Sequence, residues 1–256
     1  MTARRVLVTR PAREAVRWVD ALRSRGFDAL PLPLLETVAL EDPASLRSVA
    51  ERIAHYDALM FVSAAAVQHF FSAAPTGFVA GTRFWATGPG TAGALRAEGV
   101  PDALIDMPGL DAPQFDSEAL WRVVHSQVGA KTRVLIVRGG DELGRAEGRE
   151  WLADQVQAAG AQHDTVVAYR RRPAIWTDVQ RGIAQAAACD GSVWLFSSSR
   201  AVANLLELLP QAHWACAMAV ATHARIAHAA TQAGFGMVLT SNADVDALCA
   251  SIESLG

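Results

Sequence analysis

Short apolar runs recur along the chain, and each is followed by small or turn-forming residues and then by an amphipathic stretch. The first run, Val6–Thr9, leads into a helical pattern over Arg13–Arg25. Further strands are expected over Ala58–Val62, Phe84–Thr87, Val134–Val137, Val193–Phe196 and Ala217–Ala221, and further helices over Ala65–Ala73, Thr91–Glu98, Glu147–Ala159, Arg200–Leu209 and Ile226–Ala233. This alternation predicts an α/β fold with parallel sheets and helices on both faces.

The units also repeat. Arg5–Arg10 matches Arg133–Arg138, and Leu59–Val67 resembles Trp194–Val202. A third match joins the Ala-Thr pair that ends at Thr87 to the pair that ends at Thr222, and the same spacing to a glycine follows each. Three matches in the same order, at nearly constant separation, predict that the chain is a duplication.

Two segments occupy equivalent places after the first helix of each copy. Leu30–Glu36 and Val166–Pro173 are largely apolar and contain prolines, which favour extended backbone and edge positions. Both are interpreted as strands that run into a linker. We expect the chain to cross there between two similar domains, with the chemistry in the cleft between the copies.

Length and composition narrow the class of protein. The 256 residues are enough for two modest domains, and 51% hydrophobic with 19% charged residues is typical of a packed globular chain. No stretch approaches the roughly 18 apolar residues of a membrane helix. A strand pattern begins near Met1 and leaves no room for a signal peptide, which predicts a cytoplasmic protein. The net charge of −3 disfavours a general nucleic-acid binder.

Reactive side chains are few. The three cysteines, Cys189, Cys216 and Cys249, are far apart and are expected to be buried free thiols. The histidines show no metal-binding helix pattern, so no metal site is expected. Lys131 is the only lysine, which disfavours a Schiff base. The abundance of arginine reflects either genomic base composition or a carboxylate or phosphate ligand.

Hydroxyls, glycines and arginines follow the predicted strands. These loops are Thr9–Pro11, Ser63–Ala64, Thr87–Thr91, Arg138–Gly140, Ser197–Ser199 and Thr222–His223. Ligands of open parallel sheets bind beyond the carboxyl ends of the strands, and helix N-termini there favour anions. The pattern predicts a polyanion site, although an ordinary helix cap is the better explanation of any single serine or threonine.

Two other features have competing interpretations. Gly88–Gly93 fits the dinucleotide pattern G-x-G-x-x-G, but no acidic residue follows near the expected distance, and the equivalent loop Thr222–Ile226 has no glycine. Tyr169 ends an apolar strand and is either functional or an amphipathic residue at a surface hinge. Arg170–Arg172 beside it is interpreted as a solvated turn that raises the local positive potential. No Gly-x-Ser-x-Gly elbow is present, so the serines lack the setting of a hydrolase nucleophile.

Over nearly the whole chain, these motifs resemble the uroporphyrinogen-III synthase family of tetrapyrrole biosynthesis. The segments that carry the resemblance are Val6–Pro11, Phe61–Ser63, Ala86–Ala92, Val134–Gly139, Gly148–Leu152, Gly160–Ala161, Val166–Tyr169 and Phe196–Ser199. Their order and spacing are the signature. The resemblance implies two similar flavodoxin-like domains joined by a two-stranded linker. One is discontinuous, 1–36 plus 173–256, and the other is 40–168, with crossings near 36–40 and 168–173.

The resemblance also implies a reaction: hydroxymethylbilane is closed to uroporphyrinogen III with loss of water and inversion of the last pyrrole ring, without a cofactor. Tyr169 matches the family tyrosine of a Val-x-x-Tyr strand and is the candidate proton donor, since a phenol is protonated at neutral pH. The candidate substrate-binding residues are Arg10, Ser63, Thr87, Thr91, Arg138, Ser197, Ser198, Thr222 and His223. A monomer is expected, and direct hand-over of the substrate from hydroxymethylbilane synthase stays open.

One segment departs from the family. Where many members carry Gly-x-Thr-Thr, this chain has Ala221–Arg225, so the missing hydroxyl's role passes to Thr222 or His223, with helix capping as the alternative for His223. Two rival functions remain, a non-catalytic two-domain module that binds a polyanion and an NAD(P)-linked enzyme.

Overall fold

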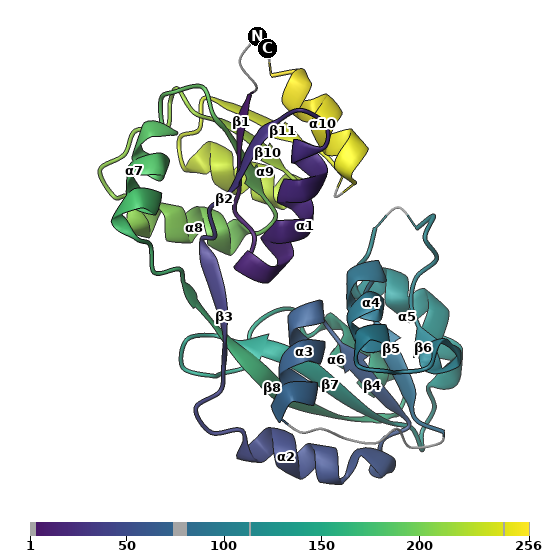
Figure 1. Ribbon diagram of the computed structural model, residues 1–256. Coiled ribbons are helices and arrows are strands. Elements are labelled where there is room, and N and C mark those ends of the chain that lie inside the picture. The colour runs from purple at the N-terminus through teal and green to yellow at the C-terminus, as the bar shows by residue number, and fades with distance from the viewer. Residues whose placement is uncertain (1–3, 74–80, 113, 243, 256) are drawn as a thin grey trace. The chain divides into compact units, whose positions relative to one another are not determined.

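The computed structural model describes residues 4–73, 81–112, 114–242 and 244–255 and divides into two compact units. Unit 1 combines residues 1–36 with 172–256, and unit 2 consists of residues 37–171. Figure 1 shows helices packed on a sheet in each unit. Among the described residues, no helix combines the length and the apolar character that crossing a membrane requires.

Unit 1 contains a five-stranded sheet, counted over the described residues, in which the assigned pairings are parallel. Its strands in spatial order are β11 (Met237–Thr240), β10 (Met218–Ala221), β9 (Val193–Phe196), β1 (Arg5–Val8) and β2 (Asp28–Pro31). Its helices are α1 (Ala12–Arg23), α7 (Asp178–Ala186), α8 (Ser199–Leu208), α9 (Ala224–Gln232) and α10 (Val245–Glu253).

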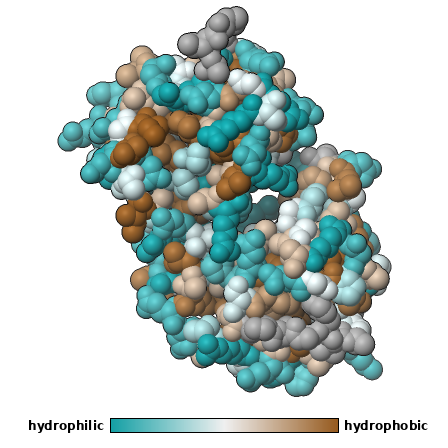
Figure 2. Space-filling model, viewed as in Figure 1, coloured by the Kyte–Doolittle hydropathy of each residue, from teal (hydrophilic) through white to brown (hydrophobic). Residues whose placement is uncertain are grey.

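Alternation along the strands of unit 1 explains its two layers of core. Val6 and Val8 pack with α1 and α10, whereas Leu7 between them packs with α7, α8 and α9 on the other face. Trp194 and Phe196 of β9 belong to the same core cluster as Leu7. Figure 1 shows α1 and α10 on one side of this sheet and α7 to α9 on the other. At the surface, hydrophobic residues gather around α7, where Ile175 and Val179 are exposed (Figure 2).

Unit 2 contains most of the second sheet, which is six-stranded over the described residues and has parallel pairing from β8 through β6; β3 and β8 each include two residues of unit 1. Its strands in spatial order are β3 (Leu35–Ala39), β8 (Gln162–Pro173), β7 (Arg133–Gly140), β4 (Ala58–Phe61), β5 (Arg83–Ala86) and β6 (Ile105–Asp106). Its helices are α2 (Ala44–Glu51), α3 (Ala64–Ala73), α4 (Pro89–Ala97), α5 (Ser117–Val124) and α6 (Trp151–Ala158), with 3-10 turns at Ile53–His55, Asp102–Leu104 and His125–Gln127.

The sheet of unit 2 is also covered on both faces. Leu135 and Val137 of β7 pack with α2, α3 and α4, whereas Val134 and Ile136 pack with α5 and α6. The prediction of an α/β fold with parallel sheets and helices on both faces is therefore confirmed.

The two sheets have the same strand order, since β2-β1-β9-β10-β11 corresponds to β8-β7-β4-β5-β6. Each of the three sequence matches joins strands at equivalent positions, namely β1 with β7, β4 with β9, and β5 with β10. The first strand of the chain lies in the sheet of the later strands β9 to β11, and β7 lies in the sheet of the earlier strands β4 to β6.

Several local expectations were wrong. The helix expected from Glu147 begins at Trp151, because the chain first forms a loop in which Gly140 and Ala146 make an antiparallel bridge. Cys189 and Cys216 are exposed and only Cys249 is buried, since Cys189 and Cys216 lie in turns beyond the strands and helices of the core.

Candidate functional site

Tyr169 lies on β8, where the pairing with β7 is irregular. Arg138 pairs with Val167, but Gly139 pairs with Tyr169, so Ala168 is an extra residue on β8. A bulge of this kind re-aims the side chains that follow it. Tyr169 consequently joins Ala168 in the core cluster on the α3 face and is only 2% exposed. The interpretation of Tyr169 as a surface hinge residue is wrong.

The phenol of Tyr169 is held from several sides. Its oxygen lies 3.2 Å from Ser63 Oγ, with either atom able to donate, and it accepts a hydrogen bond of 2.9 Å from Arg171 Nη2. Its ring stacks on His69 with 5.3 Å between the ring centroids. Gly139 faces the ring so closely that an added Cβ would lie 2.5 Å from Tyr169 Cζ. Glycine at position 139 therefore makes the room that the phenol occupies.

Arg171 reaches Tyr169 because residues two apart on a strand share a face. Its Cζ lies 5.2 Å from the centroid of the Tyr169 ring, and its Nη1 lies 3.6 Å from Glu147 Oε2. The neighbours Arg170 and Arg172 pair with the carboxylates of Glu41 and Glu36. The expectation of a solvated turn at Arg170–Arg172 is wrong, because all three residues belong to β8 and each is ion-paired.

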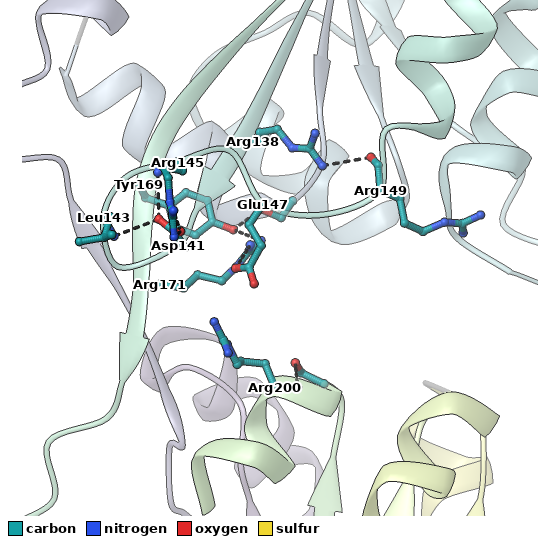
Figure 3. Close-up of polar contacts among 11 residues, drawn as sticks. Arg138, Asp141, Leu143, Arg145, Glu147, Arg149, Tyr169, Arg171 and Arg200 are labelled. Atoms are coloured by element: carbon teal, nitrogen blue, oxygen red, sulfur yellow. Dashed lines mark hydrogen bonds and ion pairs between the residues drawn. The ribbon is translucent and has the colours of Figure 1, made fainter. Parts of the chain in front are cut away.

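The loop between β7 and α6 supplies Glu147. Asp141 orders this loop, since its carboxylate accepts hydrogen bonds from the backbone N–H of Leu143 and of Arg145, and from Arg145 Nε. The backbone N–H of Arg145 is the main cause of the lowered pKa of Asp141, which keeps the carboxylate ionised. Figure 3 shows Tyr169, Glu147 and Arg171 clustered, with Arg138 turned toward Arg149.

Arg138 lies on the opposite face of β7 from Gly139 and is 5% exposed. It donates from Nη2 to the carbonyl of Arg149 at 3.0 Å and from Nη1 to Glu150 at 3.4 Å, whereas its buried Nε has no hydrogen-bond partner in the described part of the chain. Burial lowers the pKa of Arg138. A buried cation with an unused donor is stabilised by a bound anion.

Hydroxyls complete this edge of unit 2. Ser63 Oγ accepts from the N–H of Ala66 at 3.2 Å in the first turn of α3. Thr87 follows β5 and donates to the carbonyl of Val62 at 3.3 Å, and its Oγ1 lies 3.5 Å from that of the buried Thr91 in α4. Ser63 and Thr87 thus follow β4 and β5, whereas Arg138 and Tyr169 lie within β7 and β8. Because Phe61 at the end of β4 pairs with Val137, and Gly139 pairs with Tyr169, the parts of β7 and β8 that hold Arg138 and Tyr169 extend beyond the carboxyl end of β4.

Packing explains one glycine of the Gly88–Gly93 pattern at the start of α4. An added Cβ at Gly88 would lie 2.8 Å from Cβ of Phe115, so the protein itself requires a small residue there. Added Cβ atoms at Gly90 and Gly93 would meet no atom within 4 Å.

The remaining candidates lie at the carboxyl edge of the sheet in unit 1, after the adjacent strands β1, β9 and β10. Arg10 stacks on Trp18, with Cζ 4.6 Å from the ring centroid, and its Nη1 lies 3.4 Å from Glu14. Burial lowers the pKa of Arg10, against the opposing effect of Glu14, and its Nε lacks a partner among the described residues. Arg10 is therefore a second partly desolvated cation that suits an anion.

The hydroxyls and the imidazole of unit 1 lie at helix starts. Ser198 Oγ accepts from the N–H of Arg200 at 3.2 Å and caps α8, and Ser197 beside it is half-buried. Thr222 follows β10, and His223 Nδ1 accepts from the N–H of Arg225 at 3.1 Å, so His223 caps α9. Capping uses one ring nitrogen of His223 and leaves Nε2 for other contacts.

Sequence reasoning missed residues that the structure adds to these edges. Arg171, Glu147 and Gly139 surround the phenol of Tyr169, and the buried Oγ of Ser199 has no partner within the described ranges. The spacing of two residues from Tyr169 could have indicated Arg171 if the strand expected from Val166 had been continued through Arg170–Arg172, which was interpreted as a turn. Nothing in the sequence pairs Glu147 with Arg171.

A cavity of about 380 Å³ lies elsewhere in unit 2, at the amino ends of β7 and β8. Tyr56, Arg133 and Asp164 are among its lining residues, and Tyr56 Oη donates to Asp164 Oδ2 at 2.7 Å. Burial, reinforced by this hydrogen bond, raises the pKa of Tyr56 to about 12. None of the candidate site residues lines this cavity.

Comparison with known proteins places the chain in a family. The model of the family described as uroporphyrinogen-III synthase HemD matches residues 16–250. The chain is 29% identical to the uroporphyrinogen-III synthase of Salmonella typhimurium over 97% of this chain and 99% of that protein.

Crystal structures of uroporphyrinogen III synthases share its fold. The Helicobacter pylori protein has a TM-score of 0.60 at 15% identity and covers 99% of this chain and 100% of its own. A mutant of the Thermus thermophilus protein has a TM-score of 0.57 at 15% identity and covers 98% of each chain. With a family match that extends over most of its length, this chain belongs to the uroporphyrinogen-III synthase family.

Proposed function

We propose that this chain is a lyase that closes hydroxymethylbilane to uroporphyrinogen III, with loss of water and inversion of the last pyrrole ring. The observation that carries the proposal is the family match over residues 16–250, which includes residues of both units. The buried phenol of Tyr169, hydrogen-bonded at the carboxyl edge of a parallel sheet, supports an acid-assisted reaction at this edge.

The substrate carries eight carboxylates, and we assign their binding to the candidate edges. In unit 2 the binding residues are Ser63, through its backbone N–H, and Thr87, Thr91 and Arg138. In unit 1 they are Arg10, Ser197, Ser198, Thr222 and His223. Two observations support this assignment. The hydroxyls lie beside helix N-termini, which favour anions, and both arginines are partly desolvated with an Nε that no described residue uses.

Tyr169 is assigned as the general acid. Its O–H bond breaks as the proton moves to the departing hydroxyl, and the C–O bond of the substrate breaks so that water leaves with the electron pair. The lone pair of the pyrrole nitrogen completes the azafulvene. The substituted α-carbon of the last ring then attacks and forms a carbon–carbon bond, and the bond that joined this carbon to the neighbouring ring's bridge breaks. The bridge carbon bonds instead to the free α-carbon of the last ring, which inverts the ring, and the proton lost from that carbon restores the phenol. Folding of the substrate decides which carbon attacks, so positioning contributes much of the catalysis.

The organisation that accompanies this function is a further part of the proposal. Residues 1–36 plus 173–256 and residues 40–168 act as the two domains of a cytoplasmic monomer that uses no cofactor. The substrate arrives from hydroxymethylbilane synthase, either through solution or by direct hand-over.

Incubation with hydroxymethylbilane tests the proposal. The products are oxidised to porphyrins and their isomers separated by chromatography. We expect uroporphyrin III at a rate proportional to protein concentration. The uninverted isomer I alone, at the rate of a protein-free blank, would show that the chain is a non-catalytic polyanion-binding module instead. Nicotinamide cofactor at millimolar concentration should show no binding, and saturable binding would revive the dinucleotide interpretation of Gly88–Gly93.

A further inference from the structure

Arg171 is the residue that most closely controls the phenol of Tyr169. Its side chain is 23% exposed and has three contacts with two residues. Nη2 donates to the phenol oxygen at 2.9 Å, Cζ lies 5.2 Å from the ring centroid, and Nη1 lies 3.6 Å from Glu147 Oε2. These contacts hold the guanidinium against both the edge and the face of the phenol, while Glu147 balances its charge.

Hydrogen-bond directions around the phenol follow from the donor inventory. A guanidinium only donates, so the hydroxyl hydrogen of Tyr169 cannot point toward Arg171. Ser63 Oγ already accepts from the N–H of Ala66, and its own hydrogen can be donated to the phenol oxygen. With Arg171 and Ser63 both donating, the two lone pairs of Tyr169 are occupied. The phenol hydrogen is then directed at a third group.

We propose that Arg171 is a positioning residue that orients the phenol hydrogen of Tyr169 toward the departing hydroxyl and stabilises the phenolate that remains after proton transfer. This inference rests on the proposed function. As the phenol O–H bond breaks and water leaves the substrate, negative charge develops on the phenol oxygen. At that moment the hydrogen bond from the Arg171 cation gains an anionic acceptor and the one from Ser63 becomes charge-assisted, so both are stronger in the transition state than in the ground state.

A different role for Arg171 would be to bind a substrate carboxylate directly. That role predicts a raised KM, because the contact would already exist in the ground state. It also predicts an effect that persists without the phenol. The positioning role predicts a lowered kcat that disappears when Tyr169 has no hydroxyl. The two roles are therefore separable by a double-mutant cycle.

The chain offers a matched control in Arg170. This residue is the next one on β8, its side chain is 25% exposed, and it pairs with Glu41 at 2.9 Å. Strand alternation places it on the face opposite Arg171, away from the phenol. Arg170→Gln therefore removes a charge and an ion pair from β8, as Arg171→Gln does, but it leaves the contact with the phenol in place.

The experiment measures kcat and KM for uroporphyrinogen III formation in Arg171→Gln, Arg171→Lys, Tyr169→Phe, Arg171→Gln combined with Tyr169→Phe, and Arg170→Gln. We expect Arg171→Gln to lower kcat about 10- to 100-fold with KM within about twofold, because it removes a charge-assisted hydrogen bond. Arg171→Lys should retain part of the activity, since a point charge replaces the planar fork. In the Tyr169→Phe background, Arg171→Gln should change kcat less than about twofold, and Arg170→Gln alone should change it no more than that. An unchanged kcat, a raised KM, or an equal loss in both backgrounds would overturn the proposal.

A readout that needs no turnover separates this inference from the proposed function. The chain has two tyrosines, Tyr56 and Tyr169, so uniform labelling with 3-fluorotyrosine gives two fluorine signals. Arg171→Gln should shift the signal that is lost in Tyr169→Phe and leave the other in place, and Arg170→Gln should move neither. If the wild-type protein forms no uroporphyrinogen III, the proposed function fails whatever this spectrum shows. If the wild type is active and the Tyr169 signal does not move, only the inference about Arg171 fails.

Discussion

Gly139→Ala is the substitution that most directly tests how the phenol of Tyr169 is held. Gly139 does not have a positive φ, so alanine is allowed by the backbone and the effect is steric. The added Cβ would lie 2.5 Å from Tyr169 Cζ and 2.8 Å from both Cε2 and Oη. Since carbon atoms pack at about 3.5 Å or more, the ring must move by about 1 Å. That displacement stretches the hydrogen bonds to Ser63 and Arg171 together.

Two magnitudes follow from this displacement. Inserting a methyl group into a packed core costs about 1–3 kcal/mol, which lowers the Tm of a chain of this length by about 2–12 °C. A catalytic group displaced by 1 Å costs on the order of 100-fold in rate. We therefore expect Gly139→Ala to remain folded, with a modestly lowered Tm and a kcat reduced about 100-fold.

The assay combines thermal unfolding with the rate of uroporphyrinogen III formation at a temperature well below the Tm. Gly182→Ala in α7 is the matched control, since its added Cβ would meet no atom within 4 Å and alanine favours a helix by about 1 kcal/mol. The control should keep full activity and an equal or higher Tm. If Gly139→Ala keeps the wild-type kcat and Tm, Gly139 does not approach the phenol as closely as described.

Substitutions at Ser63, around Tyr56 and at His223 probe other contacts. Ser63→Ala removes a contact to the Tyr169 phenol and a hydrogen bond in the first turn of α3. The free energy of unfolding should fall by about 1 kcal/mol and kcat should fall about tenfold. An unchanged kcat would exclude the Ser63 hydroxyl from the reaction. In Tyr169→Phe the one remaining tyrosine is Tyr56, and ultraviolet absorbance should show that it ionises at about pH 12. Asp164→Asn in that background should lower the midpoint of this ionisation only in part, because burial is the main cause of the raised pKa. A midpoint near pH 10 before the second change would contradict the buried hydrogen bond between Tyr56 and Asp164. The raised pKa of Tyr56 means that its contribution to stability is present below pH 10 and is lost as the pH rises toward 12. His223→Ala should cost about 1 kcal/mol of stability and raise KM, whereas His223→Asn should restore the helix cap and not KM; recovery of both would leave His223 a cap alone.

The elements of the fold were largely predictable because local patterns determine them. The strand expected over Val193–Phe196 has those bounds in the structure. β1 begins and ends one residue earlier than expected, and β4 ends one residue earlier. Their apolar runs are buried on both faces, which is what a central parallel strand requires. The internal matches also lie on strands that occupy equivalent places in the two sheets, because the same local sequence makes the same contacts in each.

The surroundings of Tyr169 were not predictable in the same way. A regular strand would alternate, but the extra residue at Ala168 puts two successive residues into one core cluster, and this bulge depends on the pairing with β7. Arg170–Arg172 lacks the apolar alternation of a strand and was therefore interpreted as a turn. Its three partners, Glu36, Glu41 and Glu147, lie far away in the sequence, so only the folded chain shows that these charges are compensated.

The kinetics of Tyr169→Phe show whether the phenol is the proton donor, because this change deletes one oxygen atom and keeps the ring that packs on His69. The rate of hydroxymethylbilane consumption, corrected for the protein-free reaction, gives kcat and KM for the wild type and the variant. We predict a kcat lowered about 10²- to 10⁴-fold and a KM within about threefold of the wild type, as expected for loss of a general acid. A variant that turns over at the wild-type rate would contradict the assignment of Tyr169 as the proton donor.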